Sequence, residues 1–183
     1  MLVTFPQFME KVHVFLFENL LPEKLELVKS GLVAADPKYD YCFLNTQHIV
    51  SLEHLRSSIF RALDNRADGT MRAKTLNTEI IFNLLPVNNI MDALKRFGVD
   101  PACLNVIAIK VVSNDDPASE NSIELELTKL LESKPTEITD ALLLSKVDLQ
   151  KVKKLYKLND AQIPLTNDNL TKLVICSCQL RGL

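Results

Sequence analysis

The sequence has no tryptophan and only 4 glycines, and aromatic residues make up 6% of its 183 residues. Scarce glycine argues against a disordered or low-complexity chain. The hydrophobic content of 47% is ordinary for a globular protein, and this length lets one domain bury a sizeable core. Because leucine and isoleucine are abundant, we expect an aliphatic, largely helical core in a single domain over residues 1–183.

The sequence also lacks the common signatures of catalysis. It has no P-loop, no GxGxxG motif and no motif around a serine or cysteine nucleophile. His48 and His54 are six residues apart, so they do not share a helix face as i, i+4 metal ligands would, and His13 lies in an apolar stretch. Asp115 and Asp116 lack the glycine turn of a calcium loop. We expect no catalytic residue, no metal or other cofactor, and no small-molecule substrate.

The four cysteines do not form a zinc pattern. Cys176-x-Cys178 could ligate a metal, but no second cysteine or histidine pair has zinc spacing, so buried free thiols are the favoured interpretation for these two and for Cys42 and Cys103. The first residues lack the features of a signal peptide, and no apolar run reaches the length of a membrane span. We therefore expect an intracellular protein with reduced thiols and no membrane partner.

The charge is nearly balanced overall but unevenly distributed. The formal charge is −2, yet residues 115–140 carry eight acidic residues against two lysines. Residues 146–157 carry five lysines against one aspartate. Such runs are either solvated helix faces or surfaces that steer a partner.

Apolar patterning predicts an α+β fold. Strands are expected at residues 12–17, 41–44 and 104–112, the last in a central position because it is almost continuously apolar. Residues 76–85 fit either a helix or a strand, and the helix is favoured because Thr75 or Asn77 can cap it and Glu79 lies in its first turn. We expect a small, mainly antiparallel sheet of about three or more strands packed against about six or more helices. One predicted helix is opened by Ser51 and ends at the Asp68-Gly69 turn, and the others are residues 23–30, 76–85, 90–97, 123–131, 148–158 and 167–180.

Local signals define where several of these elements end. Gly31 is expected to stop the helix over 23–30, and Gly98 to end the helix over 90–97 in a left-handed conformation. Asn88 or Asn89 is expected to cap that second helix. Residues 113–121 are expected to form a flexible loop.

The best-marked segment, residues 71–98, reads MRAKTLNTEIIFNLLPVNNIMDALKRFG. It combines a basic entry, an apolar middle, a polar turn and a short amphipathic helix, but it offers no reactive group. This combination is typical of a binding module.

Three blocks in order along the chain resemble a known family. They are the segment over 71–98, VKKLYKL at 152–158 and QLRG at 179–182. Together they are similar to the PRPK-binding (TPRKB), or CGI-121-like, family, and most of all to its fungal members. Lys74 stands where that family usually has arginine, and Leu85 and Val87 make the turn more apolar than the family pattern.

The resemblance implies a non-catalytic role in the KEOPS/EKC complex. That complex installs threonylcarbamoyl on the adenosine next to the anticodon, and its chemistry belongs to a separate transferase subunit. Members of the family bind the N-lobe of a small atypical kinase/ATPase subunit and help to hold tRNA, so contact with the transferase would be indirect. The resemblance also implies nuclear and cytoplasmic localisation and a link to telomere maintenance.

Two surfaces would serve these partners. The apolar stripes of the two C-terminal helices are the candidates for kinase binding, although ordinary core packing is the favoured explanation for any single one of their residues: Val152, Leu155, Tyr156, Leu173 and Val174. Cations and amides of the 71–98 segment are the candidates for tRNA binding, with solvation or helix capping as the alternatives: Arg72, Lys74, Asn88, Asn89, Lys95 and Arg96.

Two other classes of function stay open on the sequence. An unrelated α+β adaptor would keep an apolar docking surface but would not bind RNA. An enzyme would need a deep pocket with several ionisable groups brought together only by the fold.

Overall fold

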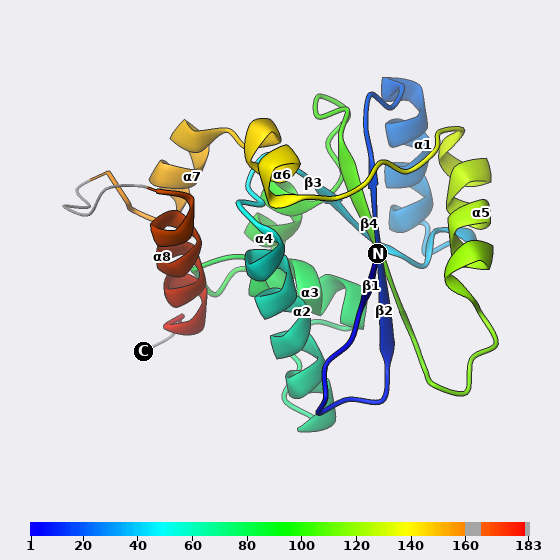
Figure 1. Ribbon diagram of the computed structural model, residues 1–183, viewed down its shortest axis with the longest axis horizontal. Coiled ribbons are helices and arrows are strands. Elements are labelled where there is room, and N and C mark those ends of the chain that lie inside the picture. The colour runs from blue at the N-terminus through cyan, green and yellow to red at the C-terminus, as the bar shows by residue number, and fades with distance from the viewer. Residues whose placement is uncertain (160–165, 182–183) are drawn as a thin grey trace. The chain divides into compact units, whose positions relative to one another are not determined.

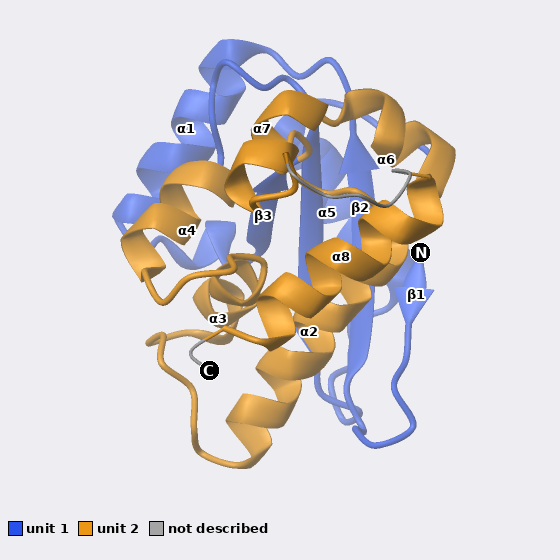
Figure 2. Ribbon diagram, turned by 90° about the vertical axis from the view of Figure 1, so that its left-hand side faces the viewer, with its two compact units in different colours: residues 1–45, 99–138 blue, residues 46–98, 139–183 orange. Residues whose placement is uncertain are grey.

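A computed structural model describes residues 1–159 and 166–181 of the chain. The chain divides into two compact units, each made of two separate stretches (Figure 2). Unit 1 comprises Met1–Asn45 and Val99–Ile138, and unit 2 comprises Thr46–Gly98 and Thr139–Leu183. A single domain over residues 1–183 stays a prediction.

Unit 1 contains a four-stranded antiparallel sheet in the order β1-β2-β4-β3. Its strands are β1 (Leu2–Val3), β2 (Lys11–Phe17), β3 (Cys42–Asn45) and β4 (Val106–Val112). β4 occupies an interior position between β2 and β3, as its continuous apolarity predicted. The two-residue β1 was not predicted.

Two helices cover one face of this sheet, α1 (Pro22–Val33) and α5 (Glu120–Leu131) (Figure 1). Alternate residues of the strands point toward them, because side chains on a strand alternate between its faces. Phe15 and Phe17 of β2 pack there with Leu25 of α1 and Leu127 of α5. Residues 113–119 connect β4 to α5, so the helix begins inside the predicted loop, and the flexibility of that loop stays a prediction.

The prediction that Gly31 ends α1 is wrong, because the helix continues to Val33. A Cβ atom at Gly31 would lie 2.2 Å from Cδ2 of the Tyr39 ring, which belongs to the short 3-10 helix η1 (Pro37–Tyr39). Gly31 therefore serves the close approach of an aromatic ring. It does not mark a helix end.

Unit 2 is helical in its described part. α2 packs against α3 and α8, and α3 packs against α4. The helices are α2 (Leu52–Ala67), α3 (Leu76–Asn83), α4 (Ile90–Phe97), α6 (Asp140–Lys146), α7 (Leu149–Leu155) and α8 (Asn167–Gln179). α6 was not predicted, and α7 ends three residues before the predicted boundary. Over the described residues the α+β class is thus confirmed, with eight helices and one four-stranded sheet.

Capping side chains fix the starts of the unit 2 helices. The hydroxyl of Thr75 accepts a hydrogen bond from the backbone N–H of Thr78, which confirms the helical reading of α3. α4 ends at Phe97 with Gly98 as its C-cap, as predicted, but the left-handed conformation predicted for Gly98 is wrong, because its φ of −65° and ψ of 176° are extended. A Cβ atom there would lie 2.4 Å from the carbonyl oxygen of Leu94, so glycine is required by a close backbone approach.

Candidate functional site

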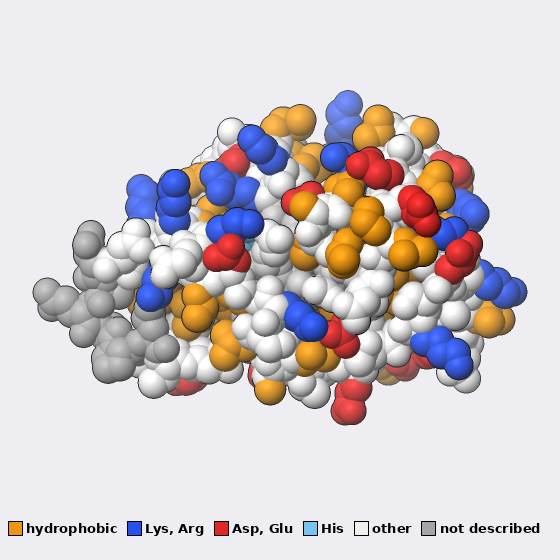
Figure 3. All heavy atoms as spheres, turned by 90° about the horizontal axis from the view of Figure 1, so that it is seen from above, with side chains coloured by type: hydrophobic (Ala, Val, Ile, Leu, Met, Phe, Trp, Pro, Cys, Tyr) orange, Lys and Arg blue, Asp and Glu red, His pale blue; other side chains and the backbone are white. Residues whose placement is uncertain are grey.

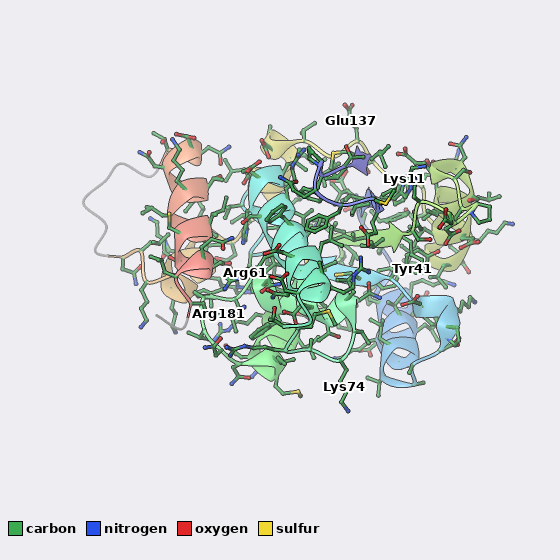
Figure 4. All side chains as sticks on the ribbon, turned by 90° about the horizontal axis from the view of Figure 1, so that it is seen from below. Lys11, Tyr41, Arg61, Lys74, Glu137 and Arg181 are labelled. Atoms are coloured by element: carbon green, nitrogen blue, oxygen red, sulfur yellow. The ribbon has the colours of Figure 1, made fainter. Side chains whose placement is uncertain are left out.

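A buried carboxylate organises the chain where it enters α3. Glu79 is fully buried and accepts hydrogen bonds from Nδ2 of Asn65 (2.8 Å) and from the backbone N–H groups of Arg72 (3.0 Å) and Ala73 (2.8 Å). These bonds fix the main chain of residues 72–73. The side chains of Arg72 and Lys74 are exposed on either side of this anchor, and Lys74 projects away from the ribbon in Figure 4.

The polar turn and α4 supply the other predicted tRNA-binding residues. Asn89 caps α4 by accepting a hydrogen bond from the Asp92 backbone N–H at 3.0 Å, and Asn88 beside it is exposed. Lys95 and Arg96 are exposed on α4, and Nε of Arg96 lies 2.9 Å from Oδ2 of Asp92. Arg96 is therefore partly neutralised.

All six predicted tRNA-binding residues lie on the surface of unit 2, and we call them the 72–96 basic surface. Two of these residues precede α3, two precede α4, and two lie on α4. α3 and α4 pack against each other. The members are Arg72, Lys74, Asn88, Asn89, Lys95 and Arg96. Their exposure makes them accessible to a polyanion, and their role stays a prediction.

Three exposed apolar side chains near the predicted tRNA-binding residues were not among the predicted contacts: Met91 and Leu94 on α4 and Val87 in the turn before it. Met91 is 74% exposed, and Leu94 and Val87 are 36% and 45% exposed. Met91 and Leu94 are three residues apart and so share a helix face, a spacing that could have identified them. These side chains add an apolar component to the neighbourhood of Lys95.

The predicted kinase-binding residues separate into two groups. Val152, Tyr156 and Val174 are buried, so they pack inside the protein and present no free surface in this structure. Leu155 and Leu173 are half-buried. If the apolar stripes contact a partner, Leu155 and Leu173 are the members within its reach.

The contacts of Tyr156 hold it inside unit 2. Its hydroxyl donates a hydrogen bond to the carbonyl oxygen of Leu84 at 2.7 Å and lies 3.4 Å from Nε2 of His54. Its ring meets the His54 ring edge to face, with centroids 6.0 Å apart. Burial raises the pKa of Tyr156, which keeps the hydroxyl protonated as a donor.

Two arginines that were not among the predicted site residues, Arg61 and Arg181, donate hydrogen bonds to backbone carbonyl groups near the C-terminal end of α8. Arg181 donates to the carbonyl oxygens of Phe82 (2.6 Å) and Leu85 (3.2 Å), and its guanidinium lies 3.8 Å from the Phe82 ring centroid. Arg61 donates to the carbonyl oxygen of Cys178 at 2.7 Å. Both are labelled in Figure 4. Burial, followed by the charge of Arg61, lowers the pKa of Arg181 to about 10.

These contacts explain part of the QLRG block at 179–182. Arginine there satisfies carbonyl groups at the C-terminal end of α3, where a cation is favoured by the helix dipole. Arg181 in that block was the feature of the sequence from which this role could have been predicted. Gly182 lies outside the described residues.

The buried histidines of unit 2 are not arranged as ligands. His48 and His54 are 5% and 1% exposed, and Nδ1 of each has no hydrogen-bond partner in the described part of the chain. Burial lowers the pKa of His48 to about 4 and that of His54 to about 3. Within residues 1–159 and 166–181, no group of three His, Cys, Asp or Glu side chains could hold a metal ion.

The cysteines agree only in part with the expectation of buried thiols. Cys42, Cys103 and Cys178 are buried and free, but Cys176 is exposed, so the prediction for that residue is wrong. α8 has the spacing to turn Cys178 inward and Cys176 outward, because residues two apart do not share a helix face. None of the described helices is long and apolar enough to cross a membrane.

A second basic region follows α6 and α7, where Figure 3 shows lysine and arginine side chains gathered on the surface. It contains the five lysines of residues 146–157, of which Lys151, Lys154 and Lys157 are exposed. Because Lys151 pairs with Asp148 at 3.7 Å and donates to Oε1 of Gln47, part of this charge is committed within unit 2.

The sequence of the chain is similar to a family of known proteins. Residues 17–182 match the family described as kinase binding protein CGI-121. The chain is 51% identical to the EKC/KEOPS complex subunit CGI121 of Debaryomyces hansenii, over 93% of this chain and 92% of that protein. It is 41% identical to the Candida albicans subunit of the same name, over 98% and 97%, and 32% identical to that of Schizosaccharomyces pombe, over 94% of each. The expected relationship is thus confirmed, and the chain belongs to the kinase-binding CGI-121 family.

Proposed function

We propose that this chain is a non-catalytic subunit of a KEOPS/EKC complex. In this role it binds the N-lobe of the small atypical kinase/ATPase subunit and helps to recruit tRNA for threonylcarbamoyladenosine modification next to the anticodon. Family membership and the names of its fungal relatives support the assignment to the complex. The observation that carries the tRNA role is the exposed 72–96 basic surface, in which Glu79 anchors the backbone of residues 72–73.

The tRNA role follows from the chemistry of the 72–96 basic surface. Lysine and arginine neutralise phosphates, which gives an affinity that depends strongly on salt and only weakly on sequence. Arg72, Lys74 and Lys95 are exposed cations for this purpose. The exposed amide of Asn88 can reach base edges or sugar hydroxyls of an unpaired RNA end, where proteins usually read RNA.

Lys74 restricts the geometry of the phosphate contact that this surface can make at its position. An ammonium group is a point charge, whereas the arginine usual at this place in the family offers a planar fork that can bind two phosphate oxygens. We therefore expect Lys74 to contribute charge and salt dependence more than a defined two-pronged contact.

The kinase role rests on family membership and on the accessible remainder of the predicted apolar stripes. Replacing Leu155 and Leu173 together with alanine should weaken binding of the kinase subunit by about tenfold, because truncation of apolar interface residues typically costs more than 1 kcal/mol at the important positions. Titration calorimetry with the purified kinase measures this. Leu27→Ala, at a 56% exposed position on α1, is the control.

A surface elsewhere is indicated if the Leu155/Leu173 variant binds the kinase as tightly as the unmodified chain. Circular dichroism of both variants separates loss of binding from loss of fold, since each replacement removes only partly buried or exposed apolar area.

The remaining expectations belong to the same proposal. The chain acts without a cofactor or catalytic residue of its own, contacts the transferase subunit only through the kinase, and works in the nucleus and the cytoplasm. A role in telomere maintenance is part of the proposal for a fungal-type member of the family.

Co-purification with the kinase subunit followed by a tRNA mobility-shift assay tests the proposal as a whole. Binding of both partners is the expected result. Kinase binding without any RNA shift would instead favour the alternative, a protein-interaction adaptor that does not bind RNA. Failure to bind the kinase would reject the proposed function.

A further inference from the structure

Unit 1 has a cavity that none of the surfaces described above includes. Its volume is about 420 Å³, and η1, β4 and α5 contribute to its walls. The charged groups around it are Lys38, Lys110, Glu126 and Lys129, and the ring of Tyr41 forms part of the wall. Lysines thus outnumber carboxylates among the lining residues.

Two of these charged groups already have partners. The Lys110 ammonium lies 2.7 Å from the carbonyl oxygen of Asp40, 3.0 Å from its Oδ2, and 4.8 Å from the centroid of the Tyr41 ring. Glu126 accepts a hydrogen bond from the Tyr41 hydroxyl at 2.8 Å. Burial, together with this bond, raises the pKa of Tyr41, so the hydroxyl stays a donor and holds the carboxylate in place.

The other two lysines have no carboxylate partner, although the Lys38 ammonium lies 5.8 Å from the centroid of the Tyr39 ring. Among residues 1–159 and 166–181, no carboxylate lies within ion-pair distance of Lys38 or Lys129, and both side chains are exposed at the cavity. Lys38 comes from η1 and Lys129 from α5, so cations from two separate elements line one hollow. Counting Asp40 with the lining groups leaves three lysines against two carboxylates, a net charge of +1.

We propose that this cavity binds a small organic phosphate of about the size of a nucleoside monophosphate. The ammonium groups of Lys38 and Lys129 hold the phosphate, since charge-assisted hydrogen bonds from lysine are a common means of binding it. The apolar walls, formed by Pro37, Leu130 and the Tyr41 ring, cover the organic part of the ligand.

The size of the cavity supports an organic ligand over a bare ion. Small-molecule sites typically have volumes of about 300–1,000 Å³ and combine apolar walls with a few polar groups, and this cavity fits both conditions. A free phosphate ion would leave the apolar walls uncovered. A long polyanion would use the lysines but would not need the hollow.

Isothermal titration calorimetry of the full chain at low salt tests the proposal with three probes. Adenosine monophosphate carries both parts of the ligand, ribose 5-phosphate lacks the base, and adenosine lacks the phosphate. We expect adenosine monophosphate to bind most tightly, because it alone engages both the lysines and the apolar walls. Equal affinity for adenosine monophosphate and adenosine would overturn the proposal, as would binding of an oligonucleotide but of none of the three probes.

Charge variants locate the site. Lys38→Glu combined with Lys129→Glu should weaken binding of adenosine monophosphate by at least about tenfold, since two charge-assisted hydrogen bonds to the phosphate are lost and two like charges are introduced. Lys29→Glu, on the exposed surface of α1 in the same unit, should leave the affinity within about twofold, the small change expected of a distant exposed charge. An unchanged affinity in the double variant would overturn the assignment.

Glu126→Gln gives a test that misfolding cannot imitate. The amide oxygen can still accept the Tyr41 hydrogen bond, while one negative charge leaves the cavity. We expect adenosine monophosphate to bind about threefold more tightly, as removal of a nearby like charge in high dielectric predicts. Weaker binding would contradict the proposal. Neither the kinase nor tRNA enters these experiments, so their outcome is independent of the proposed function.

Discussion

Replacing Glu79 with alanine should lower the free energy of unfolding by about 3 kcal/mol. The substitution leaves Nδ2 of Asn65 and the backbone N–H groups of Arg72 and Ala73 without their acceptor. Each unsatisfied buried donor costs about 1–3 kcal/mol, and water entering at the exposed edge of the segment will offset part of this. Urea unfolding followed by circular dichroism measures the change.

Two further variants sharpen the Glu79 test. Glu79→Gln keeps one acceptor oxygen but turns an amide NH₂ toward N–H donors, so it should also destabilise, though less than alanine. Glu53→Gln, at an exposed position in the first turn of α2, should cost less than about 1 kcal/mol. Equal stabilities for Glu79→Ala and Glu53→Gln would show that the buried carboxylate does not anchor the segment.

Lowering the pH from 7 to 5 should destabilise the protein by about 2 kcal/mol for each of the two buried histidines of unit 2. Burial lowers the pKa of His48 to about 4, with Lys151 and Arg96 acting in the same direction, and burial lowers the pKa of His54 to about 3. In the unfolded chain both titrate near 6.5. The unfolded state therefore binds more protons below pH 6.5, and stability is full above that value and falls as the pH drops toward 4.

Urea unfolding at a series of pH values measures this loss, and the informative quantity is the slope within each variant. His48→Leu and His54→Leu should each reduce the dependence of unfolding free energy on pH between 6.5 and 5 by about 1 kcal/mol per pH unit, whatever their stability at pH 7. Slopes equal to that of the unmodified protein would mean that other groups, such as carboxylates, cause the acid sensitivity.

Local patterning predicted most of the regular elements, because their signals lie within a few residues. The continuous apolar run around β4 indicated an interior strand, and Ser51, Thr75 and Asn89 each cap a helix close to where the sequence indicated. β1 is too short to carry a periodic pattern, and α6 has only seven residues. Neither could therefore be identified from periodicity.

The glycines show where local reasoning fails. Gly31 resembled a helix stop, yet it lies inside α1 and is required by the Tyr39 ring, whose position depends on where η1 packs. Gly98 does end α4, but glycine is required there by the close approach of the Leu94 carbonyl oxygen and not by a left-handed conformation.

The candidate surfaces were predicted to different degrees. Charged and amide residues such as Arg72 and Asn88 were expected at the surface, and all six members of the 72–96 basic surface are exposed. Periodicity identified apolar helix faces, but it does not reveal what covers them, so Val152 and Val174 were offered as contacts although they are buried. Glu79 was read only as a favourable first-turn charge because its partners lie in the preceding loop and in α2.

The most direct test of the account measures tRNA binding to the full chain as a function of salt. Arg72→Glu combined with Lys95→Glu should weaken binding and reduce the magnitude of the slope of log K against log salt by about 2, since two phosphate contacts are lost. The control is Lys11→Glu with Lys29→Glu, at exposed positions of unit 1, which makes the same change in net charge. We expect the reduced slope only in the Arg72/Lys95 variant, and identical slopes for the two variants would contradict the assignment of RNA binding to the 72–96 basic surface.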